Sequence, residues 1–86
     1  MTYSVRIGRQ AAKEIKKLPK AEVSKIVSTI RKLADDPYPS GCKKLKASDD
    51  ELYRVRQGNY RIIYAVETVV KIVEVRKVSH RKDAYR

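Results

Sequence analysis

The feature that most constrains the fold is a series of three strand-like segments in the last third of the chain, separated by short turns. From Leu52 the pattern changes: residues 53–56 alternate between apolar and cationic side chains, while residues 60–66 and 69–78 are rich in β-branched and aromatic side chains. Gln57-Gly58-Asn59 and Glu67-Thr68 are typical of tight turns. Because tight turns join antiparallel neighbours, these segments predict an antiparallel meander.

The first part of the chain predicts one strand and two helices. Residues 3–7 alternate between apolar and polar side chains, as in a strand with one buried face. Apolar side chains recur at helical spacing over residues 11–18, and again over residues 23–34, where the helix pattern is strongest. Pro19 ends the first helix and Pro37 follows the second. We therefore expect two helices that bury one face each.

The polar stretch from Pro37 to Glu51 reads as a loop, which completes the order β-α-α-β-β-β. This order predicts an α+β fold, a mainly antiparallel sheet with the two N-terminal helices packed on one face. At 86 residues the chain is expected to form a single domain, residues 1–86. We expect a cytoplasmic protein without a membrane segment, because no apolar run approaches the roughly 20 residues that span a bilayer. Cys42, the only cysteine, fits a reducing compartment.

The net charge indicates the class of partner. Lys and Arg number 21 against 10 acidic residues, a formal net charge of +11. Such a surface attracts phosphate backbones and releases their counterions, which favours nucleic acid as a partner. An acidic protein or an anionic membrane would be attracted as well. A generic basic protein, such as a ribosomal one, explains the charge equally well.

Several kinds of site are disfavoured by the residues present. One histidine and one cysteine cannot form a familiar zinc site, and no glycine-rich nucleotide-binding motif is present. The acidic run of residues 49–51 could hold a hard cation, although such a run is more often a solvated turn. The sequence therefore predicts no cofactor and no metal ion.

Alternation on the predicted strands gathers arginines on one face. If Tyr53 and Val55 face the helices, then Arg54 and Arg56 face away from them, and Arg61 on the next strand joins the two. Three guanidinium groups on one surface repel one another, so an anion such as an RNA phosphate would compensate them. Three solvated arginines remain an equally good interpretation of the spacing.

The C-terminal segment adds side chains that can take part in catalysis. His80 and Arg81 follow the last predicted strand, and Tyr85 lies near the end of the chain. Histidine suits proton transfer near neutral pH, and a tyrosine ring can stack on a base. Each of these residues alone is more often a plain surface residue. Together with the three arginines they suggest a site.

The motifs in this region resemble those of RelE-type toxins. Residues 52–64 resemble the family core LYRVRxGxYRxIY, and residues 80–86 resemble its HRxxxYR ending. Lys44-Leu45-Lys46 matches the KKL stretch before the sheet. The predicted order of elements agrees as well, so the resemblance covers nearly the whole chain.

The resemblance implies the toxin of a type II toxin–antitoxin system. Such a toxin is a ribosome-dependent endoribonuclease that enters the 30S decoding site and cuts mRNA there without a metal, and a cognate antitoxin blocks its cationic face. The ribose 2′-hydroxyl attacks the adjacent phosphate, which requires a base, charge stabilisation and an acid. By position, Arg61 matches the arginine that stabilises the phosphate, Arg81 the one assigned to the leaving group or transition state, and Tyr85 the tyrosine that stacks on the substrate.

The chain departs from the family pattern at the residues from which the general base would come. Arg54 and Arg56 stand where the best-known member has lysines, and arginine stays protonated, so Arg56 suits a phosphate clamp better than a base. His80 is then the alternative proton acceptor. Arg54, Lys44 and Lys46 would bind the RNA backbone. Two other functions are compatible with the same features: a ParE-type toxin that poisons DNA gyrase, and a non-catalytic basic RNA-binding protein.

Overall fold

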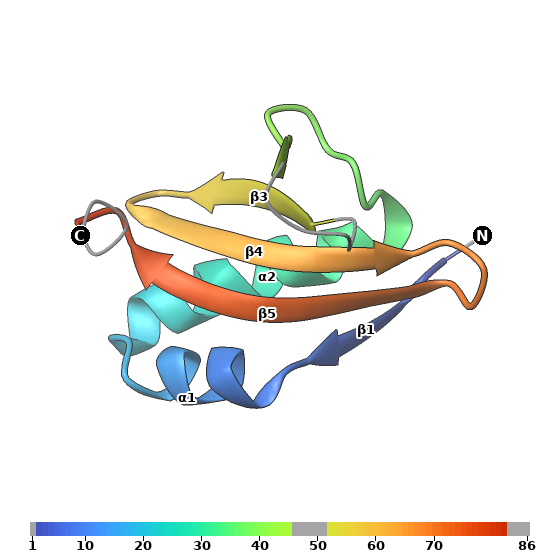
Figure 1. Cartoon of the computed structure of the whole chain (residues 1–86). Coiled ribbons are helices and arrows are strands. Elements are labelled where there is room, and N and C mark those ends of the chain that lie inside the picture. The colour runs from blue at the N-terminus through green and yellow to red at the C-terminus, as the bar shows by residue number, and fades with distance from the viewer. Residues whose placement is uncertain (1, 46–51, 83–86) are drawn as a thin grey trace.

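The computed structural model of the chain describes residues 2–45 and 52–82. Within these residues five strands form one sheet, and two helices pack on one of its faces (Figure 1). No helix in the described residues is long and apolar enough to cross a membrane. The elements are β1 (Ser4–Ile7), α1 (Arg9–Lys16), α2 (Lys20–Asp35), β2 (Lys43–Leu45), β3 (Leu52–Gln57), β4 (Tyr60–Glu67) and β5 (Ile72–His80).

The strands lie in the order β1-β5-β4-β3-β2. The last three strands form the antiparallel meander that the sequence predicts, whereas β1 pairs with β5 in parallel. The predicted α+β class and the position of the helices are confirmed. One strand was missed: β2, inside the predicted loop, pairs antiparallel with β3 over Lys43–Leu45. Three residues are too few for a detectable alternation.

The turn between β3 and β4 is as short as the sequence predicts. Gly58 and Asn59 alone connect the two strands, and Gly58 has a φ of 60°. A positive φ at the first of two loop residues is the geometry of a type II′ turn, and glycine adopts it without steric cost. The turn therefore fixes the register of β3 on β4.

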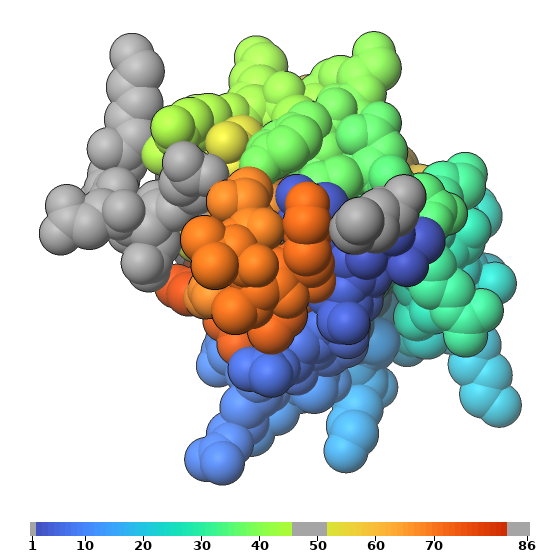
Figure 2. Space-filling model, turned by 90° about the vertical axis from the view of Figure 1, so that its right-hand side faces the viewer, coloured from blue at the N-terminus to red at the C-terminus, as the bar shows by residue number. Residues whose placement is uncertain are grey.

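The turn between β4 and β5 differs from the prediction. The predicted strand over residues 69–78 is wrong at its start, because β5 begins only at Ile72. Val69 and Val70 lie in the turn and are 94% and 57% exposed. Their β-branched side chains resemble those of a strand in the sequence, yet in the structure they are largely exposed. Figure 2 shows this turn (orange) projecting at the surface beside the start of the chain (blue).

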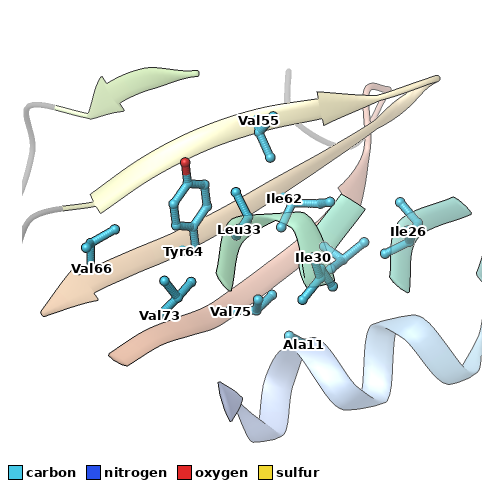
Figure 3. Packing of buried hydrophobic residues seen from close by; sticks show 11 residues of the cluster. Ala11, Ile26, Ile30, Leu33, Val55, Ile62, Tyr64, Val66, Val73 and Val75 are labelled. Carbon is cyan, nitrogen blue, oxygen red and sulfur yellow. The ribbon is translucent and has the colours of Figure 1, made fainter. Parts of the chain in front are cut away.

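The core lies between the sheet and the helices (Figure 3). Ile26, Ile30 and Leu33 of α2 pack against buried side chains of the central strands. These positions follow the i, i+4, i+7 spacing that makes one helix face apolar. The strand side chains in this core are Val55, Ile62, Tyr64, Val66, Val73, Val75 and Val78.

The hydroxyl of Tyr64 ties the core to the segment after α2. It donates a hydrogen bond of 2.6 Å to the carbonyl oxygen of Pro37, and its ring stacks on that of Tyr53 at 5.9 Å between centroids. Burial raises the pKa of the Tyr64 hydroxyl well above its ordinary value of 10.0. The neutral phenol is therefore the form that the fold requires.

A β-bulge in β5 decides which side chains of its second half face the helices. Ile63 pairs with Lys77 but Tyr64 pairs with Val75, so Arg76 is an extra residue on β5. After the bulge Lys77 faces away from the helices and Val78 faces them, opposite Ile62. The Glu14 carboxylate of α1 accepts a 2.7 Å hydrogen bond from the Val78 backbone N–H. This bond holds the second half of β5 where β1 no longer pairs with it.

Candidate active site

The strand register brings the predicted arginines together on the sheet face opposite the helices. Arg56 of β3 lies directly across from Arg61 of β4. Arg54 lies two residues before Arg56 and therefore on the same face. The shared face that alternation predicts for Arg54, Arg56 and Arg61 is confirmed. We call this surface the arginine face.

Other polar side chains share the arginine face. Lys43 lies across from Arg54, Lys77 across from Ile63, and Ser79 across from Arg61. Lys44, in contrast, pairs with Tyr53, which puts it on the helix side of the sheet. Lys46 and Tyr85 lie outside the described residues.

Three arginines surround one hollow at the end of the arginine face. Arg56, Arg61 and Arg81 line a depression of about 260 Å³ together with residues 58–60. The Arg81 backbone N–H donates a 2.7 Å hydrogen bond to the Asn59 carbonyl oxygen, which ties the end of β5 to the β3–β4 turn. Arg56 is exposed, whereas the Nε atom of Arg61 is shielded from solvent. We call this depression the arginine hollow.

His80 lies on the other side of the sheet. It pairs with Tyr60, and the two rings meet edge to face at 5.2 Å between centroids. Ser79, its neighbour, is the β5 residue that pairs with Arg61. The His80 Nδ1 atom accepts a 3.2 Å hydrogen bond from the Lys82 backbone N–H. In a neutral imidazole that accepts at Nδ1, the proton is on Nε2, so this hydrogen bond occupies the one lone pair with which the ring could accept a proton.

The electrostatics of the arginine hollow favour an anionic ligand. Its lining contains three guanidinium groups and no carboxylate. Farther along β5, the carboxylate of Glu74 forms an ion pair of 3.0 Å with Arg76. Guanidinium groups bind phosphate through paired, charge-assisted hydrogen bonds, and arginines fixed around one point stabilise charge that develops there. The hollow can therefore bind a phosphate and stabilise it as its charge increases.

The described residues form no recognisable metal site. They contain no group of three histidine, cysteine, aspartate or glutamate side chains close enough to hold an ion. The acidic run of residues 49–51 falls outside the described part of the chain.

The sequence analysis missed Lys43, Lys77 and Ser79 on the arginine face. A signal for the last two was present, because the apolar positions of β5 run Val73, Val75, Val78. Two polar residues between consecutive apolar ones break the period of two and indicate a bulge, after which the outward positions shift by one.

Comparisons with known sequences identify the family of the chain. A family described as "ParE toxin of type II toxin-antitoxin system, parDE" matches residues 5–85. The chain is also 37% identical to the putative toxin RelE1 of Methanocaldococcus jannaschii, over all of this chain and 98% of that relative. The chain belongs to the RelE/ParE toxin family.

Solved structures of this toxin family share the fold. The archaeal RelE–RelB complex from Pyrococcus horikoshii matches with a TM-score of 0.83 and 35% identity, over 94% of this chain and 97% of that one. The toxin–antitoxin complex RelBE2 of Mycobacterium tuberculosis matches with the same TM-score of 0.83 and 26% identity, over 94% of this chain and 100% of that one. The chain is therefore similar over nearly its full length to toxins solved together with their antitoxins.

Proposed function

We propose that this toxin is an endoribonuclease that cleaves mRNA in the decoding site of the 30S ribosomal subunit, in the cytoplasm and without a metal ion. The observation that carries the proposal is the convergence of Arg56, Arg61 and Arg81 on one hollow. These side chains come from β3, β4 and the residue after β5, and like charges are not brought together in this way without a cost in stability. An RNA phosphate bound in the hollow would offset that cost.

In the proposed reaction the ribose 2′-oxygen attacks the adjacent phosphorus, and the bond to the 5′-oxygen of the next nucleotide breaks. The products are a 2′,3′-cyclic phosphate and a 5′-hydroxyl. Arg56 and Arg61 would hold the non-bridging oxygens, whose negative charge grows in the transition state, and Arg81 would stabilise the leaving 5′-oxygen. Tyr85 would stack on the substrate nucleotide, while Arg54 and Lys46 would bind the RNA backbone. Lys44 lies on the helix side of the sheet, so we do not assign it a contact with RNA on the arginine face.

The proton of the 2′-hydroxyl must leave during the attack. Arg56 stays protonated and cannot accept it. The geometry of His80 also argues against it as the acceptor, because it pairs with Tyr60 on the helix side and its Nδ1 lone pair already accepts the Lys82 backbone N–H. We propose that the arginines provide most of the catalysis by stabilising charge, and that His80 does not act as the base. The 2′-hydroxyl proton then passes to solvent water, and the leaving 5′-oxygen takes a proton from water to give the 5′-hydroxyl.

Single-turnover cleavage on programmed ribosomes tests the arginine roles. Arg61→Ala and Arg81→Ala should each lower the rate about 10²–10³-fold, the usual cost of removing one group that stabilises transition-state charge. Lys32→Ala, which removes an exposed cation of α2 outside the arginine hollow, should leave the rate unchanged. Circular dichroism confirms that each variant folds. Wild-type rates in both arginine variants would overturn the assignment.

An antitoxin is the protein partner that we propose. The related toxins from Pyrococcus horikoshii and Mycobacterium tuberculosis were solved in complexes with theirs. In this chain an apolar groove of about 510 Å³ runs between β1 and the two helices, with Lys16 and Arg31 among its lining. An amphipathic antitoxin segment with acidic flanks would match that groove, and the remainder would cover the arginine face. Co-expression with a neighbouring open reading frame should restore growth that the toxin alone arrests.

The family description favours one alternative, a gyrase poison of the ParE type. Such a toxin needs no RNA phosphate site. Inhibition of gyrase without RNA cleavage would support it, and the arginine variants would then keep their toxicity.

A further inference from the structure

One hydroxyl group lies beside the arginine hollow without a role in the proposed reaction. It belongs to Ser79 of β5, which pairs with Arg61 across the sheet and precedes Arg81 by two residues. Both of these arginines line the hollow. Residues directly opposite on antiparallel strands have Cβ atoms about 4.5–5.5 Å apart. A group attached to the Ser79 oxygen would therefore lie within reach of the Arg61 guanidinium.

The end of β5 that holds Ser79 is open to a modifying enzyme. β1 pairs with β5 only as far as Val75, so beyond that residue β5 is an edge of the described sheet. Ser79 is half-buried, and the two residues after His80 are exposed. Arg76 and Lys77 precede Ser79 by three and two residues. They provide a cationic flank that the acidic substrate groove of another protein would bind.

The arginine hollow suits a phosphate on this hydroxyl. A phosphoserine carries a charge of about −1.5 to −2 at pH 7 and has three strong acceptor oxygens. The hollow, of about 260 Å³, offers it three guanidinium groups and no competing carboxylate. A phosphate on the same chain also acts at a high effective concentration, on the order of millimolar. An RNA phosphate would have to displace it before cleavage.

We propose that Ser79 is a phosphorylation site, and that its phosphate occupies the arginine hollow and blocks RNA cleavage. The Ser79 oxygen attacks the γ-phosphorus of a nucleoside triphosphate held by a separate protein kinase, whose base takes the hydroxyl proton. The bond from that phosphorus to the β–γ bridging oxygen breaks, and the nucleoside diphosphate leaves. Hydrolysis by a phosphatase regenerates the serine and restores the toxin. This inference rests on the proposed RNA cleavage.

Titration of the phosphate by phosphorus NMR tests whether it lies in the hollow. Phosphoserine is incorporated in place of Ser79 during synthesis of the whole chain. Guanidinium groups favour the dianion, so the second pKa of the phosphate, about 6 in phosphoserine, should fall by about one unit. Arg56→Gln and Arg81→Ala should each remove at least half of this shift. Phosphoserine in place of Ser28, an exposed residue of α2, is the matched control and should show no such shift.

Single-turnover cleavage on programmed ribosomes tests the effect on activity. Phosphorylation of Ser79 should lower the rate at least about 10²-fold, as loss of one charge-stabilising group does, and phosphatase treatment should restore it. Ser79→Ala should stay within about threefold of the wild type, because the hydroxyl itself has no part in the reaction. A phosphorylated toxin that cuts at the wild-type rate would overturn the inference. A 100-fold loss in Ser79→Ala would overturn it too, because the hydroxyl would then belong to the reaction.

Mass spectrometry of the toxin from the cells that encode it tests whether the site is used. We expect the mass of one phosphate group on the peptide that contains Ser79, removable by a phosphatase. Its absence from both growing and growth-arrested cells, or an unshifted pKa in the NMR titration, would overturn the inference. If the unmodified toxin cuts no RNA, the proposed function fails by itself. The titration and the mass measurement would still decide whether Ser79 carries a phosphate that the hollow holds.

Discussion

Arg56 and Arg61 face each other across the β3–β4 hairpin, an arrangement that opposes folding. Like charges directly opposite on neighbouring strands destabilise a sheet. A scaffold selected for stability alone would have an acid or a neutral residue at one of the two positions. The proposed binding of an RNA phosphate would explain why the two arginines are paired.

This explanation predicts that the Arg56 charge lowers the stability of the fold, although it serves the proposed activity. Arg56→Gln keeps most of the side chain and removes the charge, so the free energy of unfolding should rise by about 0.2–1 kcal/mol. The gain should appear in urea denaturation at low ionic strength. It should vanish near 1 M NaCl, where salt shortens the range of the repulsion (the Debye length) to about 3 Å. Lys32→Gln on α2 is the matched control and should show no such gain. A loss of stability in Arg56→Gln would mean that the arginine pair is not under electrostatic stress.

For His80 we predict that substitution has little effect on cleavage. His80→Gln keeps an N–H donor but cannot exchange protons near neutral pH. If His80 were the general base, its loss would slow single-turnover cleavage by about 10²–10⁴-fold. Because its ring lies on the helix side of the sheet, we expect less than a threefold change at saturating ribosome complex. A decrease of 100-fold or more would return the role of base to His80.

At the scale of the elements, most of the fold follows from sequence periodicity. The helices over Arg9–Lys16 and Lys20–Asp35 and the hairpin at Gly58-Asn59 were predicted because each has a strong local signal. The parallel pairing of β1 with β5 has no local signal, since it joins residues about 70 positions apart and is decided by packing. The valines of the β4–β5 turn misled the prediction, because composition alone does not tell a strand from an exposed turn.

Only the part of the candidate site that follows from simple strand alternation was predicted from the sequence. It placed Arg54, Arg56 and Arg61 correctly on one face, because β3 and the start of β4 pair without interruption. It could not place Lys77 or Ser79, which the bulge at Arg76 turns outward. Alternation also could not show that His80 lies on the opposite face of the sheet from the arginines, because that position depends on the same shift in register.

Tyr64 provides a test of how β4 holds the segment after α2. Burial keeps its pKa far above the ordinary 10.0, so above that pH only the unfolded chain ionises there and stability falls as pH rises. This single group should contribute a decrease of about 1.4 kcal/mol per pH unit. Tyr64→Phe should cost about 1 kcal/mol at pH 7 through the lost hydrogen bond to Pro37.

The difference between wild type and Tyr64→Phe should therefore shrink as pH rises above 10. Urea denaturation of both proteins between pH 8 and pH 11 would measure it. A constant difference across that range would show that Tyr64 ionises as readily in the folded protein as in the unfolded chain.

At the scale of the whole molecule, the two ends of the sheet differ in character. The arginine hollow lies at the end of the sheet where β5 finishes. The β4–β5 turn with its exposed valines lies at the opposite end (Figure 1). The net charge of +11 would attract the proposed RNA substrate at long range. The proposed cleavage is assigned to one end of the sheet, which would enter the decoding site.

Primer extension on ribosome-bound mRNA, with gyrase–DNA cleavage complexes assayed in the same cells, tests the central claim most directly. We predict new 5′-ends within decoding-site codons after expression of the wild-type toxin, none after expression of Arg61→Ala, and no accumulation of gyrase–DNA complexes. Intact mRNA together with accumulated gyrase–DNA complexes would contradict the account.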